Sequence, residues 1–208
     1  MARAMYPTAQ TTVLLVLFAS AAASQTPQTP TTTPNRDIPD FTVQIWGDTA
    51  ADFTTRVVGY AELRSHLEQG LVGLTMTEDP AEIERAEVAL AGRIAAARSR
   101  ARQGEIFTPA IGKAFKKALI LEMNAVTWGA IMDDNPGQFT HQVNRTYPKT
   151  NTVSTVPPNI LDRLPALPDD IQYRFLGRYL ILLDTRANLI IDRLTYAIRC
   201  ANCDQQAP

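Results

Sequence analysis

Two cysteines near the C-terminus are the residues whose type and spacing most directly suggest chemistry. Cys200 and Cys203 form a Cys-x-x-Cys pair, a spacing found in redox dithiols and in half-sites for zinc. A redox dithiol lies at the start of a helix that follows a strand, and no helical pattern follows this pair. Zinc would need two further ligands, and the chain contains no other cysteine. We therefore expect a structural disulfide between Cys200 and Cys203, with thiol-redox activity of the pair as the alternative hypothesis.

A second group of polar residues lies between residues 133 and 158. Asp133 and Asp134 suggest calcium ligands, but calcium loops space their acids two residues apart and end in Glu, so a polar turn is favoured. His141 could act as a general base, but no nucleophile pattern such as Gly-x-Ser-x-Gly accompanies it. A ligand cleft, if the fold has one, is expected between this loop and the C-terminal strands. Its candidate residues are Trp128, Asp133, Asp134 and His141. We predict no catalytic residue, no metal site and no cofactor.

The charge balance limits the classes of partner. The 208 residues include 20 Lys and Arg against 21 Asp and Glu, which gives a formal net charge of −1. A nucleic-acid-binding domain is expected to be basic, so no nucleic-acid partner is predicted. The length suits one domain with a single core.

Residues 1–24 have the pattern of a cleaved signal peptide. Arg3 precedes an apolar run from Val13 to Ala23, and small residues follow at the expected cleavage site, Ala23 or Ser24. This run of 11 residues is shorter than the roughly 20 needed to span a bilayer. No cysteine that could carry a lipid lies near the cleavage site. We therefore predict a bacterial protein released into the periplasm or the medium, with no integral membrane segment after cleavage.

The mature chain is expected to begin with a linker and to continue as one α+β domain, residues 41–208. Residues 25–40 are rich in Pro and Thr and predict an extended, disordered linker. Residues 48–126 have helical periodicity and predict an antiparallel bundle of about three helices. Asp48 is the expected N-cap of the first helix, and Asp79 and Thr108, each followed by Pro, mark the next two starts.

The helical part contains a set of regularly spaced apolar residues and a group of four arginines. The apolar positions expected to face the core include Phe53, Val57, Tyr60, Leu63, Leu67, Ile83, Ala86, Leu90, Ile94, Ile111, Phe115, Ala118 and Leu119. Four arginines late in the second helix complement its dipole, and a phosphate-binding role is the alternative. They are Arg93, Arg98, Arg100 and Arg102.

The helical periodicity ends after residue 126, and the C-terminal part is expected to consist of a loop followed by strands. Residues 127–168 contain six prolines and predict a long loop, with one short helical turn after Pro157 and Pro158. Residues 169–198 alternate apolar and polar side chains around two turns and predict a three-stranded antiparallel β-meander. A tail, residues 199–208, follows. The apolar central strand needs cover on both faces, and the helices can supply one of them.

The C-terminal pattern also resembles known proteins. The segments Leu164–Asp170, Tyr173–Gly177, Leu182–Asp184 and Ile190–Asp192 resemble the β-meander of exported bacterial proteins of unknown function. They are more distantly similar to the RcnB-type periplasmic proteins of nickel and cobalt homeostasis. The resemblance implies an exported α+β protein. Because the chain has only two histidines, no metal site is carried over from it.

Together these patterns favour an exported, non-enzymatic protein that binds a protein or cell-envelope partner. The thiol-redox hypothesis remains the alternative.

Overall fold

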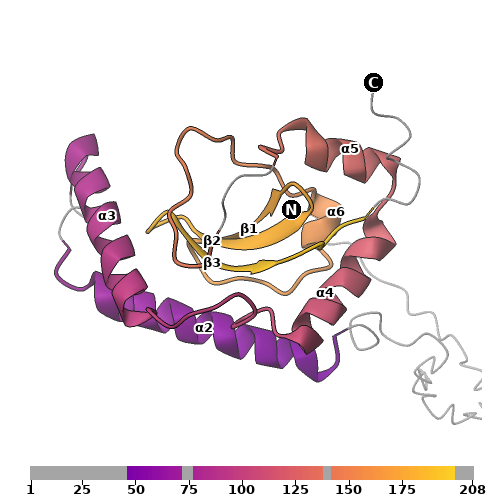
Figure 1. Ribbon diagram of the computed structural model, residues 1–208, viewed down its shortest axis with the longest axis horizontal. Coiled ribbons are helices and arrows are strands. Elements are labelled where there is room, and N and C mark those ends of the chain that lie inside the picture. The colour runs from indigo at the N-terminus through magenta and orange to yellow at the C-terminus, as the bar shows by residue number, and fades with distance from the viewer. Residues whose placement is uncertain (1–45, 72–76, 138–141, 200–208) are drawn as a thin grey trace, which may run out of the picture. The chain divides into compact units, whose positions relative to one another are not determined.

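Helices come first along the chain and strands last (Figure 1). The computed structural model describes residues 46–71, 77–137 and 142–199, all within one compact unit. The helices are α2 (Asp48–Glu68), α3 (Pro80–Ala97), α4 (Pro109–Glu122), α5 (Ala125–Asp133) and α6 (Pro158–Leu161). The strands are β1 (Ile171–Leu176), β2 (Tyr179–Asp184) and β3 (Leu189–Leu194). The α+β class and the three antiparallel strands expected from the sequence are confirmed.

Side-chain caps define the two helix starts that the sequence predicted at Asp79 and Thr108. The Asp79 carboxylate accepts from the N–H of Ala81 at 2.9 Å at the start of α3, and the Thr108 hydroxyl accepts from the N–H of Ile111 at 3.4 Å at the start of α4. The prediction that Asp48 caps α2 was wrong. Gly47 occupies the cap position without a side-chain hydrogen bond, and Asp48 lies in the first turn, where its charge still favours the helix dipole.

The apolar faces of α2, α3 and α4 meet in the main core. Helix α2 packs against both α3 and α4, while the predicted antiparallel bundle of three helices is not confirmed. The aromatic rings of Phe53 and Phe115 lie 4.9 Å apart between α2 and α4, and Phe115 lies 5.9 Å from Tyr173 of β1. The helices therefore bury their faces against the sheet as well as against one another. Ile83, which was expected in the core, is 39% exposed.

The predicted loop 127–168 contains two helical segments. Helix α5 begins after Asn124, whose side chain accepts from the N–H of Thr127 at 3.0 Å. The helix extends to Asp133, since no proline interrupts the chain before residue 136. Helix α6 forms the single turn expected after Pro157. The irregular part of this region is therefore shorter than the sequence suggested.

The strands form a meander in the order β1-β2-β3, antiparallel throughout. Gly177, at φ 54°, allows the tight turn between β1 and β2. One face of the sheet, with Tyr173, Leu182 and Ile191, joins the main core under the helices.

The other face of the sheet has a separate small core. It contains Tyr147 together with strand residues Leu176, Ile181, Leu183 and Ile190. Tyr147 belongs to the segment before α6, whose residues 144–147 bond along the outer side of β3. That irregular segment therefore supplies the second cover that the apolar central strand requires.

Candidate functional site

Of the residues proposed as a ligand cleft, Trp128, Asp133 and Asp134 lie in the described part of the chain, and none of the three lines the pocket between α2 and the segment after α3. Asp134 is occupied by Thr155, whose backbone N–H and hydroxyl donate to its carboxylate at 2.7–3.1 Å. The side-chain hydrogen bond from Thr155 lowers the pKa of Asp134. Trp128 lies under the Arg178 guanidinium at 5.6 Å, and Asp133 is exposed. These contacts explain Asp134 and Trp128 as structural residues that hold the loop.

Several predictions fall outside the described residues. They are the signal peptide (1–24), the linker (25–40), His141, and the Cys200–Cys203 pair with the thiol-redox hypothesis that rests on it. Within the described ranges no group of three metal-ligating side chains occurs. In the same ranges no helix combines the length and apolar character needed to cross a membrane.

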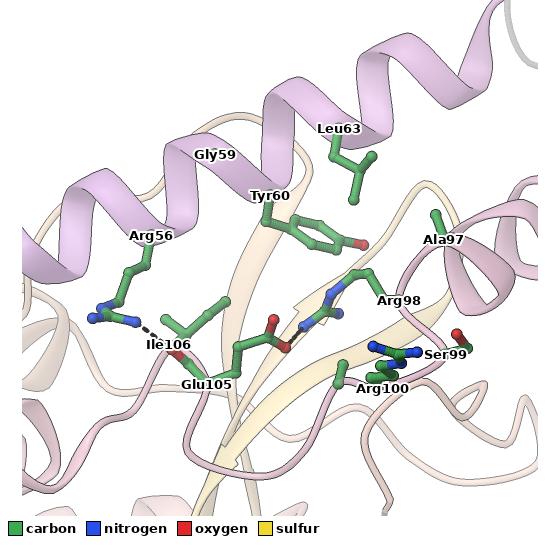
Figure 2. A pocket seen from close by; sticks show the side chains of 11 residues that line it. Arg56, Gly59, Tyr60, Leu63, Ala97, Arg98, Ser99, Arg100, Glu105 and Ile106 are labelled. Carbon is green, nitrogen blue, oxygen red and sulfur yellow. Dashed lines mark hydrogen bonds and ion pairs between the residues drawn. The ribbon is translucent and has the colours of Figure 1, made fainter.

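A pocket lies between α2 and the segment that follows α3 (Figure 2). Its volume is about 610 Å³. Three arginines, one carboxylate and two hydroxyl-bearing residues line it together with small and apolar residues. The lining residues are Arg56, Gly59, Tyr60, Leu63, Ala97, Arg98, Ser99, Arg100, Ala101, Glu105 and Ile106.

Arg98 is the most firmly held cation of this pocket. It follows the last residue of α3 and is only 9% exposed. Its guanidinium donates to Glu105 Oε2 at 2.8 Å, to Asn144 Oδ1 at 3.1 Å and to the backbone oxygen of Ile191 at 3.2 Å. It also lies over the Tyr60 ring at 5.0 Å, a cation–π geometry. These contacts fix the orientation of the guanidinium before any ligand arrives.

Two further arginines bring charge to the pocket. Arg56 donates from Nη1 to the backbone oxygen of Glu105 at 2.9 Å and from Nε to Asp52 at 2.7 Å. Arg100 is exposed at the pocket wall, and it has no ion pair among the residues that the structure describes. Against these three positive charges the lining contributes one carboxylate, Glu105. The lining therefore carries a formal charge of +2, which favours an anion.

Two fully buried acids hold the walls of this pocket. Asp184, at the end of β2, accepts the Tyr60 hydroxyl at 2.7 Å. Asp192, in β3, accepts the backbone N–H groups of Gly104, Ile106 and Phe107 at 2.7–2.9 Å. Both acids are 0% exposed. The sheet therefore positions α2 on one side of the pocket and residues 104–107 on the other.

The sequence contained a partial signal for this site. The four arginines were assigned to the end of the second helix, but α3 ends at Ala97, so Arg98, Arg100 and Arg102 lie beyond it. Arg93 donates to the backbone oxygens of Leu67 and Gln69 at the end of α2. Arg56 could not be associated with the others, because its neighbourhood depends on how α2 packs.

Comparison of the chain with protein-family models, with curated protein sequences and with solved structures gives no match.

Proposed function

We propose that this chain is an exported, non-enzymatic binding protein that holds a small organic anion in the arginine-lined pocket. The observation that carries the proposal is Arg98, whose guanidinium is buried and oriented by three hydrogen bonds and by Tyr60. A pre-oriented guanidinium recognises carboxylate or phosphate at a low cost in side-chain entropy.

The composition of the pocket narrows the ligand class. Arg100 and Arg56 add positive charge at the wall, and Ser99 adds a hydroxyl donor. Leu63 and Ile106 supply apolar surface on the same lining. A molecule with one or two carboxylate or phosphate groups on a short carbon skeleton matches both halves of this lining. The volume of about 610 Å³ is in the ordinary range for small-molecule sites.

The remaining parts of the proposal rest on the sequence. Export is supported by residues 1–24, and a role in the bacterial envelope is supported by the resemblance of the C-terminal strands to exported proteins. An envelope component that binds in this pocket is expected to do so through a carboxylate or phosphate group.

Isothermal titration calorimetry of the mature protein tests the proposal with inorganic phosphate, glycerol phosphate and succinate as probes. We expect saturable binding of at least one probe, weakened at least about tenfold in Arg56→Gln/Arg100→Gln, because two of three charges are lost. Arg85→Gln is the matched control, since Arg85 lies on α3 outside the pocket lining with a side chain 71% exposed. Absence of saturable binding, or equal affinity in the double variant and the control, would overturn the proposal.

A further inference from the structure

A second pocket lies where the start of α4 meets the end of β3, and we call it the α4–β3 pocket. Its volume is about 500 Å³. Its lining includes Lys113 and Lys116 of α4, Arg193 of β3 and the hydroxyl-bearing residues Thr108 and Thr195. The described residues of this lining include no Asp or Glu.

The contact between α4 and β3 brings cations that are far apart in the sequence to one cavity. A Cβ atom at Gly112 would lie 2.9 Å from Cδ1 of Leu194, so glycine at this position permits a close approach of the two elements. Lys113 is the next residue after Gly112, and Arg193 immediately precedes Leu194. Lys116 is three positions beyond Lys113 and therefore shares its helix face.

Hydrogen bonds hold the β3 side of this pocket in place. The Arg193 Nε atom donates to Gln103 Oε1 at 2.8 Å, and the Arg193 backbone N–H donates to Asp192 Oδ1 at 2.7 Å. The same buried carboxylate accepts the N–H groups of Gly104 and Phe107, and both of these residues line the pocket. The wall is therefore formed before any ligand arrives.

The α4–β3 pocket is separate from the arginine-lined pocket, although one segment of chain borders both. Glu105 and Ile106 line the arginine-lined pocket, whereas Gly104 and Phe107 line the α4–β3 pocket. On the side of α2, Arg56 donates to the backbone oxygen of Glu105 at 2.9 Å. The two pockets therefore lie on opposite sides of residues 104–107, and each can be tested without the other.

The charge of the α4–β3 pocket favours an anion more strongly than that of the arginine-lined pocket. Its three cations, with no acid among the described lining residues, give a formal charge of +3. Like charges three positions apart on a helix repel each other, so Lys113 and Lys116 are unfavourable neighbours until an anion lies between them. Apolar surface from Phe107 and Leu194 lines the same cavity and strengthens the field inside it.

We propose that the α4–β3 pocket is a second anion site and that it binds a phosphate group. A phosphate monoester carries nearly two negative charges at neutral pH and presents three acceptor oxygens. Three cations that reach the cavity from two elements match such a group better than a carboxylate, which carries one charge. Lysine binds phosphate as a compact point charge, and arginine adds a planar fork of donors.

The hydroxyl groups complete the proposed site. The Thr108 hydroxyl accepts from the N–H of Ile111 at 3.4 Å, so its own proton can donate to a phosphate oxygen. Thr195 supplies a second hydroxyl on the β3 side. The same arrangement suits a free phosphate ion and the end group of a phosphate ester, and the experiment separates these two sources.

A titration of the full mature chain, followed by NMR at constant ionic strength, tests the proposal with inorganic phosphate, glycerol phosphate and succinate. The amides of Gly112 and Thr195 report the α4–β3 pocket, and those of Gly59 and Ser99 report the arginine-lined pocket. We expect saturable shifts at the α4–β3 amides with both phosphate probes and at least about tenfold weaker binding of succinate there. Tighter binding of glycerol phosphate than of inorganic phosphate indicates a phosphate ester, and any other order indicates the free ion.

Lys113→Gln/Lys116→Gln is expected to weaken phosphate binding at the α4–β3 amides at least about tenfold, because two of three cations are lost. Both lysines are exposed, so the variant should fold. Lys117→Gln/Arg85→Gln is the matched control. It removes two positive charges from α4 and α3 outside the lining and should change the affinity by no more than about threefold.

Four outcomes would overturn the proposal. The α4–β3 amides could show no saturable shift with phosphate, succinate could bind there as tightly as phosphate, or both double variants could lose affinity equally. In the fourth, Arg56→Gln/Arg100→Gln abolishes the shifts in both pockets, which would show that the two are not separate sites. If this variant abolishes only the shifts at Gly59 and Ser99, both sites stand. Shifts confined to the α4–β3 amides of the unaltered protein would support this site and contradict the arginine-lined one.

Discussion

Tyr60 of α2 donates a hydrogen bond of 2.7 Å to the buried carboxylate of Asp184, a residue 124 positions further along the chain. Asp184 also accepts the N–H groups of Arg186 and Ala187 at 2.9 and 3.0 Å. The carboxylate therefore closes the turn after β2 and joins that turn to the helical layer. Arg64 lies 3.6 Å from the same carboxylate, so the buried charge has a cationic neighbour.

Replacing Tyr60 by Phe is expected to lower the free energy of unfolding by about 1.5–3 kcal/mol, the range for a hydrogen bond to a charged group. The ring still fills its place, so the loss reports mainly the hydroxyl. Urea unfolding at pH 7 followed by circular dichroism measures it. Tyr196→Phe is the control, since Tyr196 is 55% exposed. An equal effect of both substitutions would contradict the assigned role of Tyr60.

The same tyrosine is expected to make the fold sensitive to alkali. Burial raises the pKa of Tyr60, and the Asp184 carboxylate raises it further. Burial also raises the pKa of Tyr147 and of Tyr173. Above pH 10, the ordinary tyrosine value, the unfolded chain releases protons that the folded chain retains. The free energy of unfolding must therefore fall as the pH rises above about 10. Urea unfolding between pH 8 and pH 11 should show this fall, and a smaller slope in Tyr60→Phe.

The Asp134–Thr155 contact predicts the opposite dependence at acid pH. The pKa of Asp134 is lowered from 3.8, first by the Thr155 hydroxyl, so the folded state releases its proton at a lower pH than the unfolded state. The stabilisation is complete above about pH 4 and is lost as the pH falls through the folded pKa. Wild type and Asp134→Ala should therefore differ in stability at pH 7 and converge below pH 4. A difference that persists unchanged at pH 2.5 would show that the carboxylate charge is not its source.

The sequence predicted the strands well and the helix-to-helix arrangement less well. Alternation and turn residues define β1 to β3 locally, and each strand pairs with its neighbour in the chain. Asp184, the last residue of β2, and Asp192, within β3, belong to the segments on which the resemblance was based. Their partners are Tyr60 for Asp184 and the N–H groups of Gly104, Ile106 and Phe107 for Asp192. These partners lie 85 to 124 positions away, and no local rule identifies such pairs.

The contacts of the candidate site also could not be predicted from local sequence patterns. Arg98 and Arg100 were noted as a charged group, but the explanation by helix dipole assumed that α3 continues past Ala97. The helix ends there, and the Asn144 side chain then accepts from Arg98 and donates to its backbone oxygen at 2.6 Å. Asn144 has a positive φ of 60°, which asparagine tolerates better than most residues. A contact of this kind depends on the fold of the whole domain.

Asp192 provides the most direct test of how the sheet shapes the arginine-lined pocket. Its Oδ2 accepts the N–H groups of Ile106 and Phe107, and its Oδ1 accepts those of Gly104 and Arg193. An Asn side chain has the same shape but turns an NH₂ group toward one of these donor pairs. Two N–H groups then lose their acceptor, at about 1–3 kcal/mol each.

We therefore expect Asp192→Asn to lower the free energy of unfolding by at least about 2 kcal/mol, measured by urea unfolding at pH 7. Asp133→Asn, at an exposed carboxylate, should change it by no more than about 0.5 kcal/mol. Because Asp192 fixes residues 104–107, the substitution should also release Glu105 from Arg98, and amide exchange at Ile106 and Phe107 should rise in the folded protein. A variant as stable as the wild type, with these amides still protected, would show that the wall of the pocket is held by other contacts.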